Sequence, residues 1–210
     1  MKVNLDIDLR SQLGPVRDQG ARATCLSHAV SASHEHVLAS SARLSVEYLH
    51  YFAARGHPSK GSTIAEMRAV LEREGQPEER LCPDLTRDPP KSWMPAPGLP
   101  VFRRKSRVVP ATVANAVEAI RATRIPILGI GLPHGFFRPK PPWIILPGNA
   151  NVGLHAVVGV GLGSSDGESV ILIRNSWGLR WGDGGHALLT SEFLRRHLVD
   201  IMLLAEDAAT

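Results

Sequence analysis

The segment from Gly14 to Val30 contains Gln19 and, six residues later, Cys25, at a point where a helix is expected to begin. Thr24 is a suitable N-cap residue, and apolar residues recur at helical spacing after Cys25 as far as about residue 40. The first turn of a helix carries a partial positive charge, which favours a cysteine there as the thiolate, its nucleophilic form. The segment therefore predicts a reactive cysteine.

A thiolate nucleophile needs a proton-transfer partner, usually a histidine whose ring is oriented by a third group. His155 is the best candidate because it opens the strongly apolar, strand-like segment 155–163. Asn175 and Trp177 end the next strand-like segment, where an amide could hydrogen-bond the imidazole and an indole could exclude water. Purely structural roles stay open for all three: a strand-edge histidine, a turn asparagine and a core tryptophan.

The other histidines are weaker candidates. His28 follows Cys25 by three residues on the same helix and is badly placed to take the thiol proton. We expect a solvated position for His34, His36, His50, His57 and His197, a loop position for His134 and a structural role for His186. Neither Cys25 with His28 nor any other set has the ligand spacing of a metal site, so we expect no metal and no cofactor.

Helices dominate the first half of the chain and strands the second. Further helices are expected after Ser45, after Thr63, which forms a capping-box pattern with Glu66, and after Thr112. The proline-rich segment 81–110 is expected to cross between two lobes. Short runs of branched apolar residues then predict strands at 125–132, 155–163, 169–177, 185–190 and 198–204. This order indicates an α+β fold rather than alternating βαβ units.

Composition excludes several classes. The net charge of +4 is mild, and the compact basic run 103–107 is expected to be a solvated loop, so we expect no nucleic-acid partner. Two cysteines do not make a disulfide framework. The chain as given has no apolar run typical of a signal peptide or a membrane span, and we expect a cytoplasmic protein that binds no membrane.

The order Gln19, Cys25, His155, Asn175 resembles that of the papain-like cysteine peptidases, family C1. His155 and Asn175 lie 130 and 150 residues after Cys25, which is the spacing of that family. The segments PVRDQG, LSVEYL, LHAVVGVG and IRNSWGLRWGDGGHALL carry the resemblance across nearly the whole chain, and the last is the most specific. The resemblance implies a single papain-like domain over residues 1–210. It would have a helical lobe at about 10–105, an antiparallel β-barrel-like lobe at about 106–210, and an active-site cleft between them.

The resemblance also implies roles for the site residues. Cys25 would attack a peptide carbonyl as a thiolate paired with protonated His155, and a thioester would form and be hydrolysed. The Cys25 backbone N–H and the Gln19 amide would hold the oxyanion, Asn175 would orient the imidazole, and Trp177 would shield their hydrogen bond from water. The expected partner is a peptide or protein substrate, with a partner domain or protein inhibitor also open, and we expect a monomer.

Several positions depart from the family pattern. Arg22 stands where the family has a disulfide cysteine, so Cys82 is expected to be a free, packed thiol. Ala23 replaces a glycine that faces substrate, and Leu26 replaces an aromatic residue. Gly61 is the remaining candidate for binding extended substrate, beside Ala23 and Trp177. Only eight residues precede Leu9, and we therefore expect a divergent, bacterial-style member without a propeptide.

Two alternatives to a peptidase stay open. A papain-fold module without activity could bind peptides or a partner protein, and an acyl or amide transferase could use the same thioester. The segment 136–151, which contains Phe136, Phe137 and Trp143, is expected either to line or cover the cleft or to pack on the β lobe.

Overall fold

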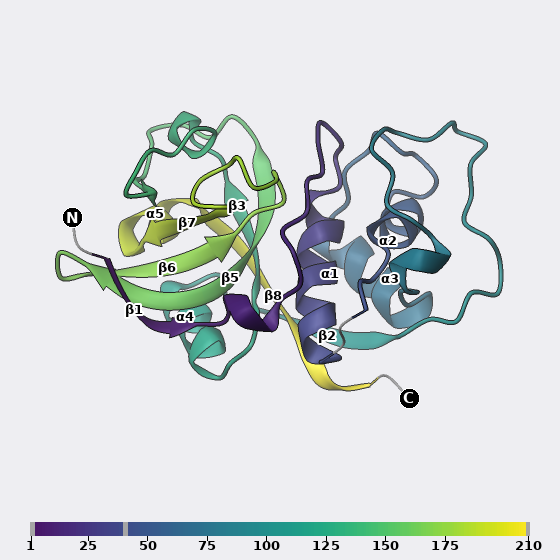
Figure 1. Ribbon diagram of the computed structural model, residues 1–210, viewed down its shortest axis with the longest axis horizontal. Helices are drawn as coiled ribbons and strands as arrows, with labels where there is room; N and C mark the ends of the chain where they lie inside the picture. The colour runs from purple at the N-terminus through teal and green to yellow at the C-terminus, as the bar shows by residue number, and fades with distance from the viewer. Residues whose placement is uncertain (1–2, 40–41, 209–210) are drawn as a thin grey trace.

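The computed structural model describes residues 3–39 and 42–208. In Figure 1, strands and two short helices form one lobe, α2 and α3 lie in the other, and α1 runs between them. Within the described residues the helices are α1 (Cys25–Val37), α2 (Val46–Ala53), α3 (Ile64–Arg73), α4 (Val113–Arg121) and α5 (Ser191–His197). The strands are β1 (Val3–Asp8), β2 (Arg104–Val109), β3 (Ile127–Gly131), β4 (Ile144–Ile145), β5 (Leu154–Ser165), β6 (Glu168–Arg174), β7 (His186–Thr190) and β8 (Leu198–Ala208).

The helical lobe forms as the sequence predicts. The Ser45 side chain caps α2 by accepting from the Tyr48 N–H, and Thr63 and Glu66 form a complete capping box at α3. The apolar stripe of α3, which includes Met67 and Leu71, is buried against the other helices. Helix α1 begins at Cys25 with Thr24 at its N-cap position, as predicted, but the Thr24 side chain makes no capping hydrogen bond.

The β lobe is built on an eight-stranded sheet in the described residues, with the order β2-β8-β3-β5-β6-β7-β4 and β1 paired with β5 outside this path. All pairs are antiparallel except β4 with β7. Strand β5 is long enough to pair with β1, β3 and β6. Gly161 and Gly163 are needed there, because a Cβ atom would lie 2.5 Å from the Ile7 carbonyl oxygen and 2.2 Å from that of Asn4.

The α+β class and the two lobes are thus confirmed, and the sheet of the described residues is open rather than closed into a barrel. Four of the helices and strands in the described residues were not predicted: β1, β2, β4 and α5. The basic run expected to be a solvated loop belongs to β2, which pairs with β8, and Arg104 is buried there. The solvated positions expected for His34, His50 and His197 are also wrong, since all three side chains are buried.

Charged residues lie between the lobes, where α1 packs on β5. Arg17 Nη2 donates to Glu35 Oε1 and to Glu79 Oε2, at 2.8 Å each, and Arg174 Nη1 donates to the Gly14 carbonyl at 2.7 Å. Burial lowers the pKa of Arg174 to about 10, which still leaves the guanidinium charged at neutral pH. No helix in the described ranges is long and apolar enough to cross a membrane.

Candidate active site

Helix α1 begins at Cys25, and its sulfur faces strand β5. The cysteine is half-buried, and the backbone N–H of Ala156 acts on the thiol by lowering its pKa. Ala156 directly follows His155, which lies in β5 near its start. The fold therefore brings the predicted nucleophile from the helical lobe to the strand that carries the predicted imidazole.

The tautomer of His155 follows from its hydrogen bonds. Asn175 Oδ1 accepts from the Ser176 backbone N–H at 2.8 Å, which identifies this amide atom as the oxygen. The same oxygen lies 2.7 Å from His155 Nε2, so Nε2 must be the donor. The neutral ring then carries its lone pair on Nδ1 and can accept a proton there.

Aromatic side chains surround this hydrogen bond. The Trp177 ring lies 4.6 Å from the His155 ring between centroids, and the Phe136 ring lies edge-on at 5.9 Å. Phe136 is fully buried and also contacts Trp181, whose indole N–H donates to the Phe136 carbonyl at 3.0 Å. Phe137 stacks on Trp177 with 43% of its surface exposed. The segment 136–151 therefore begins with one core aromatic and one that covers Trp177.

Gln19 is oriented from both lobes. Its Nε2 donates to the Arg22 carbonyl at 2.7 Å, and its Oε1 accepts from the Ser176 hydroxyl at 2.6 Å. The Gln19 backbone N–H donates to the Ser176 carbonyl at 2.8 Å. One hydrogen of the Nε2 group is left for another acceptor.

Sequence reasoning missed Ser176, which joins Asn175 to Gln19. Its position directly after the candidate asparagine was the only available signal. The hydroxyl partner lies 157 residues away and cannot be read from a local pattern.

Burial opposes charge on both members of the predicted pair. It raises the pKa of the Cys25 thiol, although hydrogen bonds from backbone N–H groups, first that of Ala156, act in the other direction. Burial lowers the pKa of His155 to about 4, and the hydrogen bond to Asn175 only partly offsets this. These directions favour a neutral thiol beside a neutral imidazole. Burial thus acts against the resting thiolate that the helix dipole favours.

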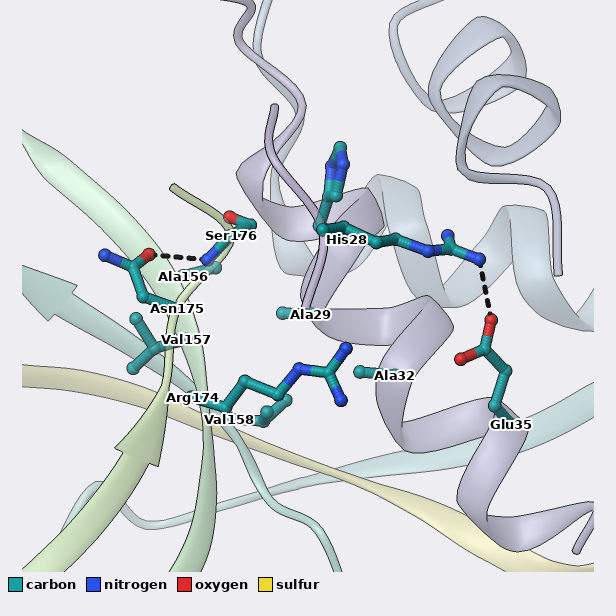
Figure 2. A pocket seen from close by; sticks show the side chains of 11 residues that line it. His28, Ala29, Ala32, Glu35, Ala156, Val157, Val158, Arg174, Asn175 and Ser176 are labelled. Atoms are coloured by element: carbon teal, nitrogen blue, oxygen red, sulfur yellow. Dashed lines mark hydrogen bonds and ion pairs between the residues drawn. The ribbon is translucent and has the colours of Figure 1, made fainter. Parts of the chain in front are cut away.

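A small cavity lies behind these residues, between α1 and strands β5 and β6 (Figure 2). Its volume is about 20 Å³, close to that of one water molecule. Figure 2 shows Arg174 reaching from β6 toward Ala32 of α1, with Asn175 and Ser176 on the same wall as Arg174. Cys25 does not line this cavity. The cavity therefore belongs to the interface between the lobes rather than to the reacting groups.

The structure does not bring the other candidates together with the reacting atoms. His28 Nδ1 lies 3.0 Å from the Thr24 carbonyl oxygen, and its Nε2 faces Asp84 at 3.6 Å. Ala23 is half-buried beside Cys25, whereas Gly61 is exposed. A substrate role for Ala23, Gly61 and Trp177 stays a prediction. In residues 3–39 and 42–208 no group of His, Cys, Asp or Glu side chains is arranged to hold a metal ion.

Sequence comparisons point to one family. The model of the papain family cysteine proteases matches residues 146–197, the region of His155 and Asn175. Peptidase 1 of Dermatophagoides farinae is 30% identical over 196 residues, which cover 89% of this chain and 60% of that protein. Chymopapain of Carica papaya is 54% identical over 35 residues, or 17% of this chain and 10% of that protein. The chain thus spans about 60% of the length of Peptidase 1 and matches only 10% of chymopapain.

Solved structures agree on the fold. Xylellain, a cysteine protease from Xylella fastidiosa, superposes with a TM-score of 0.81 at 18% identity, covering 97% of this chain and 86% of that one. The bromelain protease from Ananas comosus, solved with the E64 inhibitor, gives 0.78 at 20% identity and covers 95% and 97%. The chain therefore has the papain-like fold, and its sequence is similar to those of papain family cysteine proteases.

Proposed function

We propose that this protein is a cysteine peptidase that hydrolyses peptide bonds through a thioester on Cys25. One observation carries the proposal: Asn175 Oδ1, fixed by the Ser176 N–H, holds His155 as the Nε2–H tautomer. This leaves Nδ1 as the basic ring nitrogen for the thiol proton. A peptide or protein is the proposed substrate.

The reaction begins from the neutral pair. His155 Nδ1 takes the thiol proton as the sulfur bonds to the carbonyl carbon, and the C=O π electrons move to the oxygen. The Cys25 backbone N–H, which no intrahelical bond uses, and the free Nε2–H of Gln19 are the proposed donors to this oxyanion. Collapse breaks the C–N bond, and the amine leaves with the proton from Nδ1. Water, deprotonated by His155, then hydrolyses the thioester and restores the thiol.

Replacement of the sulfur tests the proposal. Cys25→Ala is expected to abolish hydrolysis of a peptide library and to abolish covalent labelling by an epoxide inhibitor, with an unchanged unfolding midpoint. Cys82→Ala is the matched control, because Cys82 is the other cysteine of the chain and carries a free thiol. Hydrolysis that survives in Cys25→Ala would refute the proposal. Labelling of Cys25 without any hydrolysis by the wild type would instead favour a binding module.

Replacement of the amide tests the oxyanion assignment. Gln19→Ala is expected to lower kcat by about 10²–10³-fold, the usual loss for one oxyanion donor. Alkylation of Cys25 by iodoacetamide should change little, because that reaction forms no oxyanion. Gln12→Ala, at an exposed glutamine of the same N-terminal region, is the control. A kcat equal to wild type in Gln19→Ala would remove Gln19 from the site.

A further inference from the structure

We infer that Arg22 is a positioning residue for the proposed reaction. Its guanidinium fixes the loop that carries Gln19 to helix α2, and its backbone fixes the Gln19 amide. The inference rests on the proposed function of Cys25 and Gln19. We call Arg22, with its partners Glu47, Asp88 and the Leu85 carbonyl, the arginine clamp.

The arginine clamp uses every nitrogen of one guanidinium. Nη1 and Nη2 donate to the two carboxylate oxygens of Glu47 at 2.6 and 2.8 Å, which is the bidentate geometry. Nε donates to Asp88 Oδ1 at 2.9 Å, and Nη1 also donates to the Leu85 carbonyl at 2.9 Å. The side chains of Arg22 and Glu47 are only 4% and 1% exposed. A buried bidentate pair of this kind fixes both the position and the orientation of the guanidinium.

The clamp reaches the Gln19 amide through one residue. The Arg22 carbonyl accepts from Gln19 Nε2 at 2.7 Å, and the Arg22 N–H donates to the Gln19 carbonyl at 3.3 Å. The side chains next to Arg22 add little packing, since Gly20 and Ala21 are exposed and Ala23 is half-buried, and the loop is otherwise held by the hydrogen bonds between Gln19 and Ser176. A displaced guanidinium therefore moves the carbonyl that orients the proposed oxyanion donor.

Helix α2 is a rigid support for the clamp. Glu47 lies in the first turn of α2, where Ser45 caps the helix and the positive end of the dipole favours a carboxylate. Glu47 Oε2 also accepts from the Leu85 N–H at 3.3 Å. The clamp thus joins three segments that are distant in sequence: the loop after β1, helix α2 and the segment around residues 85–88.

Three variants weaken the arginine clamp to different degrees. Arg22→Met removes the guanidinium, Arg22→Lys keeps the charge without the fork, and Glu47→Gln keeps the shape of the partner without its charge. We expect kcat for a peptide substrate to fall by about 10–100-fold in Arg22→Met and by less in the other two, as for a small displacement of a catalytic group. KM and the rate of iodoacetamide alkylation of Cys25 should stay within about threefold, because neither depends on an oxyanion donor.

A double-mutant cycle separates positioning from general damage. If Arg22 acts through the Gln19 amide, Arg22→Met should cause almost no further loss of kcat in a Gln19→Ala background. Met67→Ala is the matched control, because it opens the buried core of α3 in the same lobe without touching the clamp. At temperatures well below its unfolding midpoint, Met67→Ala should keep the wild-type kcat.

A peptide aldehyde tests the clamp without turnover. The Cys25 sulfur adds to the aldehyde carbon, the C=O π bond breaks, and the thiol proton moves to the oxygen, which lies at the oxyanion donors. We expect affinity for the aldehyde to fall with kcat along the series. A wild type that binds the aldehyde but does not hydrolyse peptides would defeat the proposed function and still test the clamp.

Two results would overturn the inference. One is a folded Arg22→Met or Arg22→Lys variant whose kcat and aldehyde affinity stay within twofold of wild type. The other is a cycle in which the losses from Arg22→Met and Gln19→Ala multiply. If Arg22→Met does not fold, Arg22→Lys and Glu47→Gln decide the question by the same readouts.

Discussion

The two sides of the active site are held by different forces. On the β lobe, His155 has aromatic neighbours, Phe136 and Trp177, and a neutral amide partner, Asn175. On the helical lobe, buried ion pairs fix the loop that carries Gln19: Arg17 with Glu35, and Arg22 with Glu47. Ser176 hydrogen-bonds across the boundary between them.

The difference follows from what each side must do. In the proposed reaction, His155 accepts a proton at one ring nitrogen. Apolar packing favours the neutral ring, and the Asn175 oxygen fixes its tautomer. A loop that contains Gly20 at φ +60° and exposed small residues buries too little apolar surface to hold itself. Directional charge-assisted hydrogen bonds therefore fix the position of this loop in place of apolar packing.

The largest effect is expected where the aromatic side is broken. Phe136→Ala removes a fully buried ring that contacts His155, Trp177 and Trp181, and it should cost about 3–5 kcal/mol of unfolding free energy, measured by urea denaturation. Phe137→Ala is the neighbouring control. Its ring is 43% exposed and stacks on Trp177, so the loss should be about 1 kcal/mol or less. Similar losses of unfolding free energy in the two variants would show that the buried aromatic cluster around Phe136 does not stabilise the β side of the site.

The pH dependence of labelling tests whether this dry environment keeps the pair neutral. Burial raises the pKa of the Cys25 thiol above its ordinary range and lowers the pKa of His155 to about 4. Between these values the thiol is protonated and the imidazole neutral, so the thiolate fraction grows about tenfold per pH unit. Iodoacetamide alkylation, followed in Cys82→Ala so that one thiol remains, should therefore rise about 100-fold from pH 7 to pH 9. A rate already level between pH 5 and pH 8 would instead indicate a thiolate–imidazolium pair.

Local sequence patterns predicted much of the aromatic side and little of the ionic side. Strands β5 and β6 are long apolar runs, and the residues at their ends, His155 and Asn175, lie where the spacing placed them. The helix starts at Ser45 and Thr63 were equally readable, because caps are local signals.

Pairings between distant residues could not be read in this way. Arg22 and Glu47 are 25 positions apart, and Arg22 and Asp88 are 66 apart, with no periodicity connecting them. The same reason explains Arg104, whose strand is defined only by its pairing with β8. It also explains His34, which hydrogen-bonds Gln76 from 42 residues away. Tertiary contacts, rather than local polarity, bury these side chains.

The smallest effect is expected at the exposed arm of the arginine clamp. Asp88 is 37% exposed, whereas Glu47 is 1% exposed, although both accept from Arg22. Asp88→Asn should therefore cost about 0–1 kcal/mol of unfolding free energy, the usual range for solvent-exposed ion pairs. It should change kcat by less than twofold, because the Glu47 fork still fixes the guanidinium.

The salt dependence of stability is the control for Asp88→Asn. Screening at about 1 M salt acts mainly on exposed charges, so the difference in stability between wild type and Asp88→Asn should nearly vanish there. The larger difference between wild type and Glu47→Gln should persist, since that pair is shielded from solvent. If Asp88→Asn matched Glu47→Gln in both kcat and salt response, the exposed Arg22–Asp88 ion pair would be what fixes the Arg22 guanidinium. The loop that carries Gln19 would then be held by a solvent-exposed ion pair, and buried charge would no longer distinguish the helical side from the β side.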